Sequence, residues 1–171
     1  ISYIILSDYD KAIQNFDASE QILKKQKNPS KEAQEILAKT LGSKDIAFSE
    51  KNNYAKALEY DFRAVKIYED LENKLQLSKI YNNIGVIYNS IDDGKKALQY
   101  FLKANQLQKQ DNNPAVEVSA SNIGLIYLKQ NQKAKAKQYF DESLKAFEIH
   151  PNPRGLGELY NNYSRYYIAE N

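Results

Sequence analysis

The stretch YNNIGVIYNS, residues 81–90, contains the pattern that decides the fold. The large apolar residues of this stretch and its flanks are Ile80, Tyr81, Ile84, Ile87, Tyr88 and Ile91. The last five follow Ile80 by one, four, seven, eight and eleven positions, which places all six on one face of an α-helix. The opposite face carries two adjacent asparagines, Asn82 and Asn83. Asparagine is a mediocre helix former because its side chain competes for backbone hydrogen bonds. The stretch therefore predicts an amphipathic helix with two polar residues that need another explanation.

This phrase recurs along the chain. YNNIGVIY at residues 81–88 is followed by ASNIGLIY at 120–127 and by YNNYSRYY at 160–167, so the period is 39 or 40 residues. A second phrase follows the first two copies, as KKALQYFLKA at 95–104 and KAKQYFDESLKA at 135–146. Earlier variants are AKALEYDFRA from residue 55 and DKAIQNFDAS from residue 10. A fixed period of this length predicts repeated helical hairpins, each of which must stack on its neighbours.

These phrases resemble the tetratricopeptide repeat (TPR) family. The matching residues are Tyr81, Ile84, Gly85, Tyr88, Ala97 and Phe101 in one repeat and Ala120, Ile123, Gly124, Tyr127, Ala136 and Phe140 in the next. The usual period of the family is about 34 residues, so this chain is similar to its longer-repeat branch, which includes kinesin light chains and bacterial signalling proteins. The resemblance implies an all-α fold, a right-handed α-solenoid of antiparallel helix pairs with a concave and a convex face.

The repeat boundaries expected from this resemblance divide one array that covers residues 1–171. They are the end of repeat 1 (1–30), repeat 2 (31–73), repeat 3 (74–112), repeat 4 (113–152) and the first helix of repeat 5 (153–171). Repeat 2 departs from the family pattern, because Lys44 and Asp45 stand at the positions of the large apolar residue and the glycine, and Asp61 stands at that of the phenylalanine. The sequence contains no methionine, so we expect it to be a segment of a longer protein.

The resemblance also implies a binding site. In the family, the concave groove is lined by first-helix residues that point away from the partner helix, including the residue two before the glycine. An asparagine amide at that position complements a peptide backbone unit, since it offers both donors and an acceptor. The residues expected to bind a peptide are Asn82, Asn83, Asn122, Asn161, Asn162, Ser43, Ser121, Lys79, Val86, Leu125 and Arg165. The alternative is that the asparagines brace adjacent repeats or face water.

Composition excludes several other classes of function. Lysine and arginine total 24 against 22 acidic residues, and the resulting charge of +2 gives no sign of a nucleic-acid partner. There is no cysteine, and one histidine, His150, cannot form a metal site. No phosphate-binding loop or catalytic motif is present, and no apolar run has the length of a membrane span. We therefore expect no enzyme, no cofactor and no membrane insertion of this segment.

Two functional hypotheses remain. The first is a protein–protein interaction module that binds an extended peptide or a partner helix in the groove. The alternative is the sensory or regulatory region of a bacterial histidine kinase or transcription regulator, which would transmit a signal to an effector domain outside this segment. Uncapped terminal helices also allow self-association. The compartment stays undetermined, with the cytoplasm favoured over the periplasm. The series Tyr60, Tyr100 and Tyr139 on the second helices is interpreted as packing between repeats, because a platform for nucleobases would need a basic stripe beside it.

Overall fold

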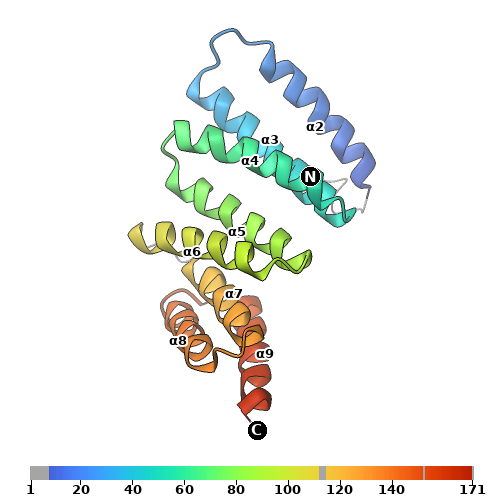
Figure 1. Ribbon diagram of the computed structural model, residues 1–171. Coiled ribbons are helices and arrows are strands. Elements are labelled where there is room, and N and C mark those ends of the chain that lie inside the picture. Colours follow the sequence, from blue (N-terminus) through green and yellow to red (C-terminus); the bar gives the residue numbers. More distant parts are fainter. Residues whose placement is uncertain (1–7, 112–114, 152, 171) are drawn as a thin grey trace.

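The computed structural model describes residues 8–111, 115–151 and 153–170, and the regular secondary structure within these ranges is entirely helical. The helices are α2 (Tyr9–Lys24), α3 (Lys31–Glu50), α4 (Tyr54–Asp70), α5 (Lys74–Ser90), α6 (Gly94–Gln110), α7 (Val116–Lys129), α8 (Lys133–Ile149) and α9 (Pro153–Glu170). They follow one another in chain order along a single axis from α2 to α9 (Figure 1). The first helix expected for repeat 1 lies outside the described residues.

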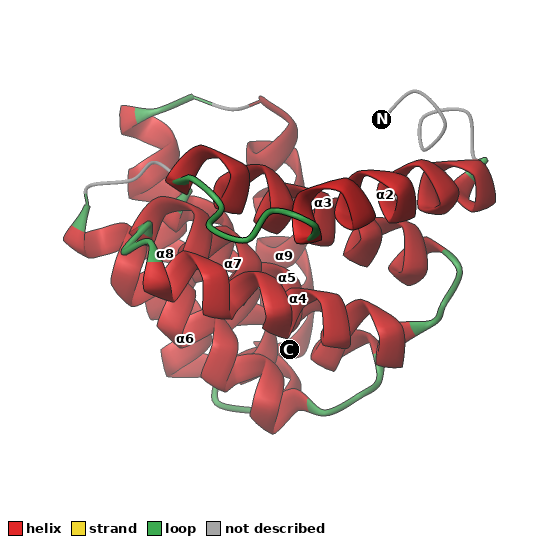
Figure 2. Cartoon of the chain, turned by 90° about the horizontal axis from the view of Figure 1, so that it is seen from above, coloured by secondary structure: helices red, strands yellow, loops and turns green. Residues whose placement is uncertain are grey.

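The helices form successive hairpins. The most extensive packing joins α5 with α6, α7 with α8 and α3 with α4, and each hairpin contacts the next through α4 on α5 and α6 on α7. Seen from above, the hairpins overlap as a stack with most of the connecting turns at its periphery (Figure 2). This is the arrangement of a solenoid, in which each unit contacts mainly its sequence neighbours.

The turns after α3, α4, α5 and α7 explain why these helices stop where they do. Four three-residue turns have a middle residue in the left-handed conformation: Asn52 (φ 56°), Glu72 (φ 53°), Asp92 (φ 60°) and Asn131 (φ 57°). The next amide then donates to a carbonyl in the last turn of the helix, as Asp93 N does to Tyr88 O at 2.9 Å. This geometry satisfies carbonyl groups that the helix end leaves free. In three of the four turns the third residue also caps the next helix, as the Asp93 side chain does by accepting a hydrogen bond from Lys96 N at 3.0 Å.

Small and aromatic residues close each hairpin. Ala97 and Ala136 are fully buried, and so are the rings of Phe101 and Phe140. Tyr88 of α5 stacks on Tyr100 of α6 with ring centroids 5.6 Å apart, and Tyr127 of α7 stacks on Tyr139 of α8 at the same distance. The tyrosine series on the second helices therefore packs mainly against aromatic residues of the first helix of its own hairpin. The predicted packing between repeats is seen for Tyr100, whose ring centroid lies 6.0 Å from that of Phe62 of α4.

One continuous core runs through the stack. Its buried members include Leu41 of α3, Tyr68 of α4, Ile84 of α5, Phe101 of α6 and Ile123 of α7. A smaller cluster continues it through α8 to Leu159 and Tyr166 of α9. Because the core is shared between hairpins, no single hairpin buries its apolar surface alone. The predicted fold class, an all-α solenoid of antiparallel helix pairs, is confirmed.

Candidate functional site

Three cavities lie along the first helices of the described hairpins. The α3–α5 cavity, of about 190 Å³, is lined by Asp45, Ile46, Ser49, Glu50, Asn83, Val86 and Ile87. The α5–α7 cavity, of about 320 Å³, is lined by Lys79, Asn82, Asn83, Gln108, Ala115 and Val118. The α7–α9 cavity, of about 260 Å³, is lined by Val118, Ser121, Asn122, Leu125, Phe147, Gly155, Glu158, Asn161, Asn162 and Arg165. Adjacent cavities share Asn83 or Val118, so we call the three together the first-helix groove.

The asparagines of the predicted ladder connect the first helices to one another. The side-chain amide of Asn83 donates to Asp45 Oδ2 at 3.4 Å, that of Asn122 donates to Asn82 Oδ1 at 3.3 Å, and that of Asn162 donates to Ser121 Oγ at 2.9 Å. Each bond joins one first helix to the preceding first helix, so the asparagines brace adjacent repeats.

The strength of this bracing differs along the ladder. The first two hydrogen bonds are longer than the usual 2.7–3.2 Å for an amide donor, whereas the third is short and Asn162 is buried. Asn83 and Asn122 are half-buried, and within the described residues their Oδ1 atoms accept no hydrogen bond. These two amides therefore keep polar groups available to a ligand, while Asn162 is committed to packing.

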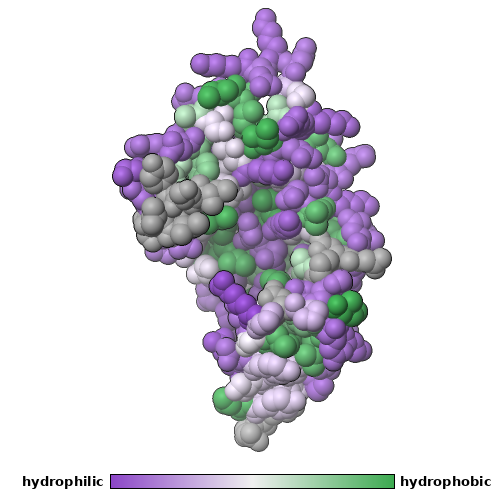
Figure 3. All heavy atoms as spheres, turned by 180° about the vertical axis from the view of Figure 1, so that it is seen from behind, coloured by the Kyte–Doolittle hydropathy of each residue, from purple (hydrophilic) through white to green (hydrophobic). Residues whose placement is uncertain are grey.

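Apolar side chains accompany the amides in the groove. Ile46 and Val86 occupy the same repeat position on α3 and α5 and are 45% and 44% exposed. Leu125 is half-buried at that position on α7, and Arg165 takes it on α9. The surface seen in Figure 3 carries scattered apolar patches between hydrophilic side chains. The groove thus combines apolar contacts with amide groups and only a few charges.

Most of the predicted site residues meet in this groove. Ten of the eleven line one of its three cavities, and Ser43 lines none of them. The Ser43 hydroxyl donates instead to Lys39 O of its own helix at 3.0 Å. The sequence analysis did not include Asp45 and Glu50, which give the α3–α5 cavity an acidic lining. The signal that could have found Asp45 was its place at the glycine position of the repeat.

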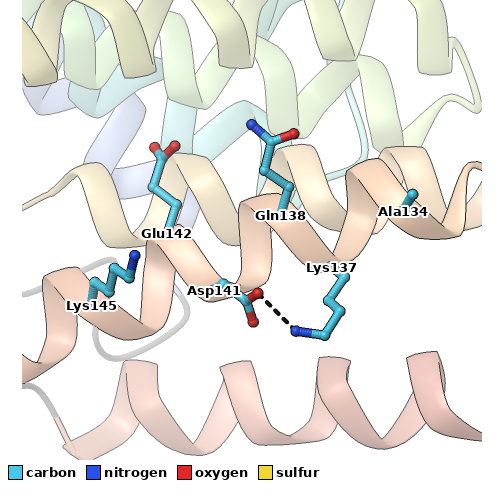
Figure 4. A pocket seen from close by; sticks show the side chains of 6 residues that line it. All are labelled: Ala134, Lys137, Gln138, Asp141, Glu142 and Lys145. Carbon is cyan, nitrogen blue, oxygen red and sulfur yellow. Dashed lines mark hydrogen bonds and ion pairs between the residues drawn. The ribbon is translucent and has the colours of Figure 1, made fainter.

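A fourth and larger cavity lies on α8 and has a different character. It encloses about 530 Å³ and is lined by Ala134, Lys137, Gln138, Asp141, Glu142 and Lys145, all on α8. Figure 4 shows that Lys137 and Asp141 point toward α9, whereas Gln138 and Glu142 point the other way. Its acids already have partners, since Asp141 binds Lys137 and Tyr163, and Glu142 binds Lys109 and Asn105. It therefore offers no unpaired acid to a ligand.

A buried ion network joins α2 to the first complete hairpin. Lys44 Nζ lies 2.5 Å from Glu20 Oε2 and 2.6 Å from Asp17 Oδ1, and Lys44 and Glu20 are both buried. Arg63 and Lys24 also bind Glu20. Burial by itself would raise the pKa of Glu20, but hydrogen bonds from Lys24, Lys44 and Arg63 lower it to about 2. Lys44 occupies the repeat position that Ile84 has in the next repeat, so the network replaces an apolar core contact and has a structural role.

Other kinds of site find no support in the described residues. They contain no cluster of three or more metal-ligating side chains, and no helix among them has the length and apolar character that crossing a bilayer requires. His150 is exposed at the end of α8.

Comparison with known proteins supports the repeat assignment. A tetratricopeptide repeat family model matches residues 76–149, and a sequence comparison with curated proteins gives no match. Aspartyl phosphate phosphatase F from Bacillus subtilis superposes with a TM-score of 0.85 at 20% identity, over 96% of this chain and 42% of that protein. A Rap protein complexed with Competence and Sporulation Factor gives 0.70 at 18%, over 95% and 49%.

A further similar structure is a Podosopora anserina putative kinesin light chain with nearly identical TPR-like repeats. Its TM-score is 0.73 at 12% identity, over 96% of this chain and 82% of that protein. The present chain thus spans less than half the length of the phosphatase and of the Rap protein. Its hairpins and its glycine and phenylalanine positions agree with the matching family model, and residues 76–149 are tetratricopeptide repeats.

Proposed function

We propose that this chain is a protein–protein interaction module that holds an extended peptide or a partner helix in the first-helix groove. The observation that carries the proposal is the line of water-accessible apolar side chains Ile46, Val86 and Leu125, which occupy one repeat position on α3, α5 and α7. Exposed apolar surface that continues from repeat to repeat is typical of a binding face.

The amides supply the polar half of such a site. Asn83 and Asn122 make only long hydrogen bonds to the preceding repeat, so exchanging these bonds for bonds to a peptide backbone loses little. Packed helices lie about 8–10 Å apart, and an extended chain rises about 3.3 Å per residue. A peptide of about nine residues would therefore pass all three cavities, with about three residues in each.

The test uses peptides selected from a random dodecamer library on the wild-type protein. Their affinity is then measured by titration calorimetry for wild type, Asn83→Ala, Asn122→Ala and Val86→Glu, with Gln138→Ala on α8 as the matched control. Leaving a buried partner unpaired costs about 1–3 kcal/mol, so each asparagine variant should bind about 5- to 150-fold more weakly. Val86→Glu should also weaken binding, and Gln138→Ala should not. Peptides that bind Asn83→Ala, Asn122→Ala and Val86→Glu as tightly as the wild type would refute the proposal that the first-helix groove binds them.

A regulatory role in a larger bacterial protein is the second candidate. The matched segment covers less than half of the phosphatase and of the Rap protein that share this fold, which is compatible with an array that serves further parts of a protein. In that case the array would transmit a signal to an effector domain of a histidine kinase or transcription regulator. The sequence of the parent gene separates the candidates, since an adaptor alone requires no effector domain. We propose no catalytic step for the array itself.

We also propose self-association through the terminal helices. Tyr160 and Tyr167 of α9 are 57% and 52% exposed, whereas Tyr81 and Tyr88, at the same positions of α5, are buried under α6. The α9 face therefore presents a surface of the kind that another helix covers elsewhere in the array.

A further inference from the structure

The hairpin α3–α4 is closed by a different contact from the other two. In α5–α6 and α7–α8, a phenylalanine ring lies against a glycine, as Phe101 does on Gly85. At the corresponding positions of α3–α4 stand Asp45 and Asp61, which are 2% and 0% exposed. The residues at these positions of α5–α6 are in direct contact, so the same register places the two carboxyl groups next to each other, and the charge of Asp45 acts on Asp61. Two acids have thus replaced both members of an apolar contact in the core.

Neither acid has a counter-ion in the described part of the chain. Asp45 accepts hydrogen bonds from the Ser49 hydroxyl at 3.1 Å and from the Asn83 amide at 3.4 Å. Neither oxygen of Asp61 has a hydrogen-bond partner among the described residues. Asp45 faces the α3–α5 cavity, which Glu50 also lines, so the other acid nearby adds repulsion.

The charged groups on the surrounding helices are engaged elsewhere. Lys44 of α3 binds Asp17 and Glu20 of α2, Arg63 of α4 binds Glu20, Lys56 of α4 lies over the ring of Phe48, and Lys103 of α6 lies over that of Tyr100. From α5, the group that reaches the pair is the neutral amide of Asn83. Two ionised carboxylates buried next to each other without a cation would be strongly unfavourable.

We infer that Asp45 and Asp61 share one proton at neutral pH, and that the resulting Asp61 O–H to Asp45 hydrogen bond closes the α3–α4 hairpin. The proton resides on Asp61, which has no other donor to satisfy its oxygens, while Asp45 keeps its bonds from Ser49 and Asn83. Loss of the proton to solvent leaves two negative charges in the interface and drives α3 and α4 apart. Because Asp45 also accepts from Asn83, opening this hairpin releases the first brace of the groove.

The direction of the pH dependence follows from the same geometry. Burial raises the pKa of Asp61 far above its ordinary value of 3.8, and the neighbouring charge of Asp45 raises it further. Burial also raises the pKa of Asp45. The folded state thus binds more protons than the unfolded state above pH 3.8. The contribution of the protonated pair to the free energy of unfolding is therefore complete below pH 3.8. It is lost as the pH rises through the pKa values that the two acids have in the folded protein.

Urea unfolding between about pH 5 and pH 9 tests this inference on the whole chain. Wild type should become less stable as the pH rises. Asp61→Asn, whose amide donates to Asp45 at every pH, should abolish most of that dependence. The double variant Asp45→Gly with Asp61→Phe, which recreates the contact of α5–α6, should abolish it too. Asp93→Asn, at an exposed helix cap where asparagine also caps, is the matched control and should keep the wild-type dependence.

Carbon-13 NMR of the aspartate side chains in the wild type provides a readout that does not depend on how a variant folds. One buried aspartate should remain protonated at neutral pH. Hydrogen exchange should show α3 and α4 losing protection first as the pH rises. Full ionisation of both carboxyls at neutral pH, or a wild-type pH dependence in Asp61→Asn, would overturn the inference. Neither result bears on peptide binding, which is tested separately.

Discussion

The ring of Phe101 lies directly against the backbone of Gly85. A Cβ atom built at position 85 would be 2.6 Å from two atoms of that ring, and the same geometry recurs at Gly124, where the nearest atoms of Phe140 are 2.5 Å away. Both rings are almost fully buried, so neither can move without disturbing the core. The glycine of the repeat is therefore required by a close approach of two helices.

Replacing this glycine by alanine should destabilise the protein despite the better helix propensity of alanine. Overpacking a well-packed core typically costs about 1–3 kcal/mol, and we expect Gly85→Ala and Gly124→Ala to fall in that range in urea unfolding. Gly157→Ala in α9 is the matched control, because nothing lies within 4 Å of a Cβ at that position. It should be stabilising by up to about 1 kcal/mol. Equal effects at Gly85 and Gly157 would contradict this explanation.

The buried Lys44 should matter far more than an exposed lysine in a similar ion pair. Lys44→Met keeps most of the side-chain volume but removes the charge that Glu20 and Asp17 share. Breaking a buried pair costs about 3–5 kcal/mol, and we expect the lower end because Lys24 and Arg63 still bind Glu20. Lys51→Met, which breaks the exposed pair with Asp10, should cost less than about 1 kcal/mol.

Acid should reveal the contribution of Glu20. Its pKa is lowered from 4.5 to about 2 in the folded protein, so the folded state releases this proton more readily than the unfolded state. The stabilisation is therefore present above pH 4.5 and is lost as the pH falls through about 2. Measured by thermal unfolding, the stability difference between wild type and Glu20→Gln should shrink over that interval. A difference that stays constant with pH would show that the interaction does not depend on the charge of Glu20.

The architecture could be predicted because it depends on local, repeated signals. The apolar spacing around Tyr81, Ile84 and Tyr88 specifies one helix face, and Gly85 with Ala97 specifies a close helix pair. Once one hairpin is defined, the 39- or 40-residue period fixes the others. The position of the groove follows as well, since residues on the face opposite the partner helix must meet on one side of the stack.

The chemistry of the groove depends on distances between repeats, which no local pattern encodes. Whether Asn83 braces Asp45 or faces a ligand is decided by the rotation of one hairpin on the next. The pairing of Lys44 with Glu20 requires the register of α2 on α3. The pairing of Asp45 with Asp61 could be predicted only in part. Both departures from the family pattern are visible in the sequence, but the burial of the two acids in one interface is seen only in the structure.

The apolar face of α9 should cause self-association that depends on concentration. Tyr160, Tyr167 and Ile168 are 57%, 52% and 73% exposed, and burying one such side chain contributes about 1.5–3 kcal/mol. In sedimentation velocity, wild type should show a dimer whose dissociation constant rises at least tenfold in Tyr160→Glu and in Ile168→Glu. Ile46→Glu places the same charge on a similarly exposed residue in the groove and should leave the association unchanged. A wild type that is monomeric at every concentration, or association lost in Ile46→Glu alone, would show that α9 is not the contact surface.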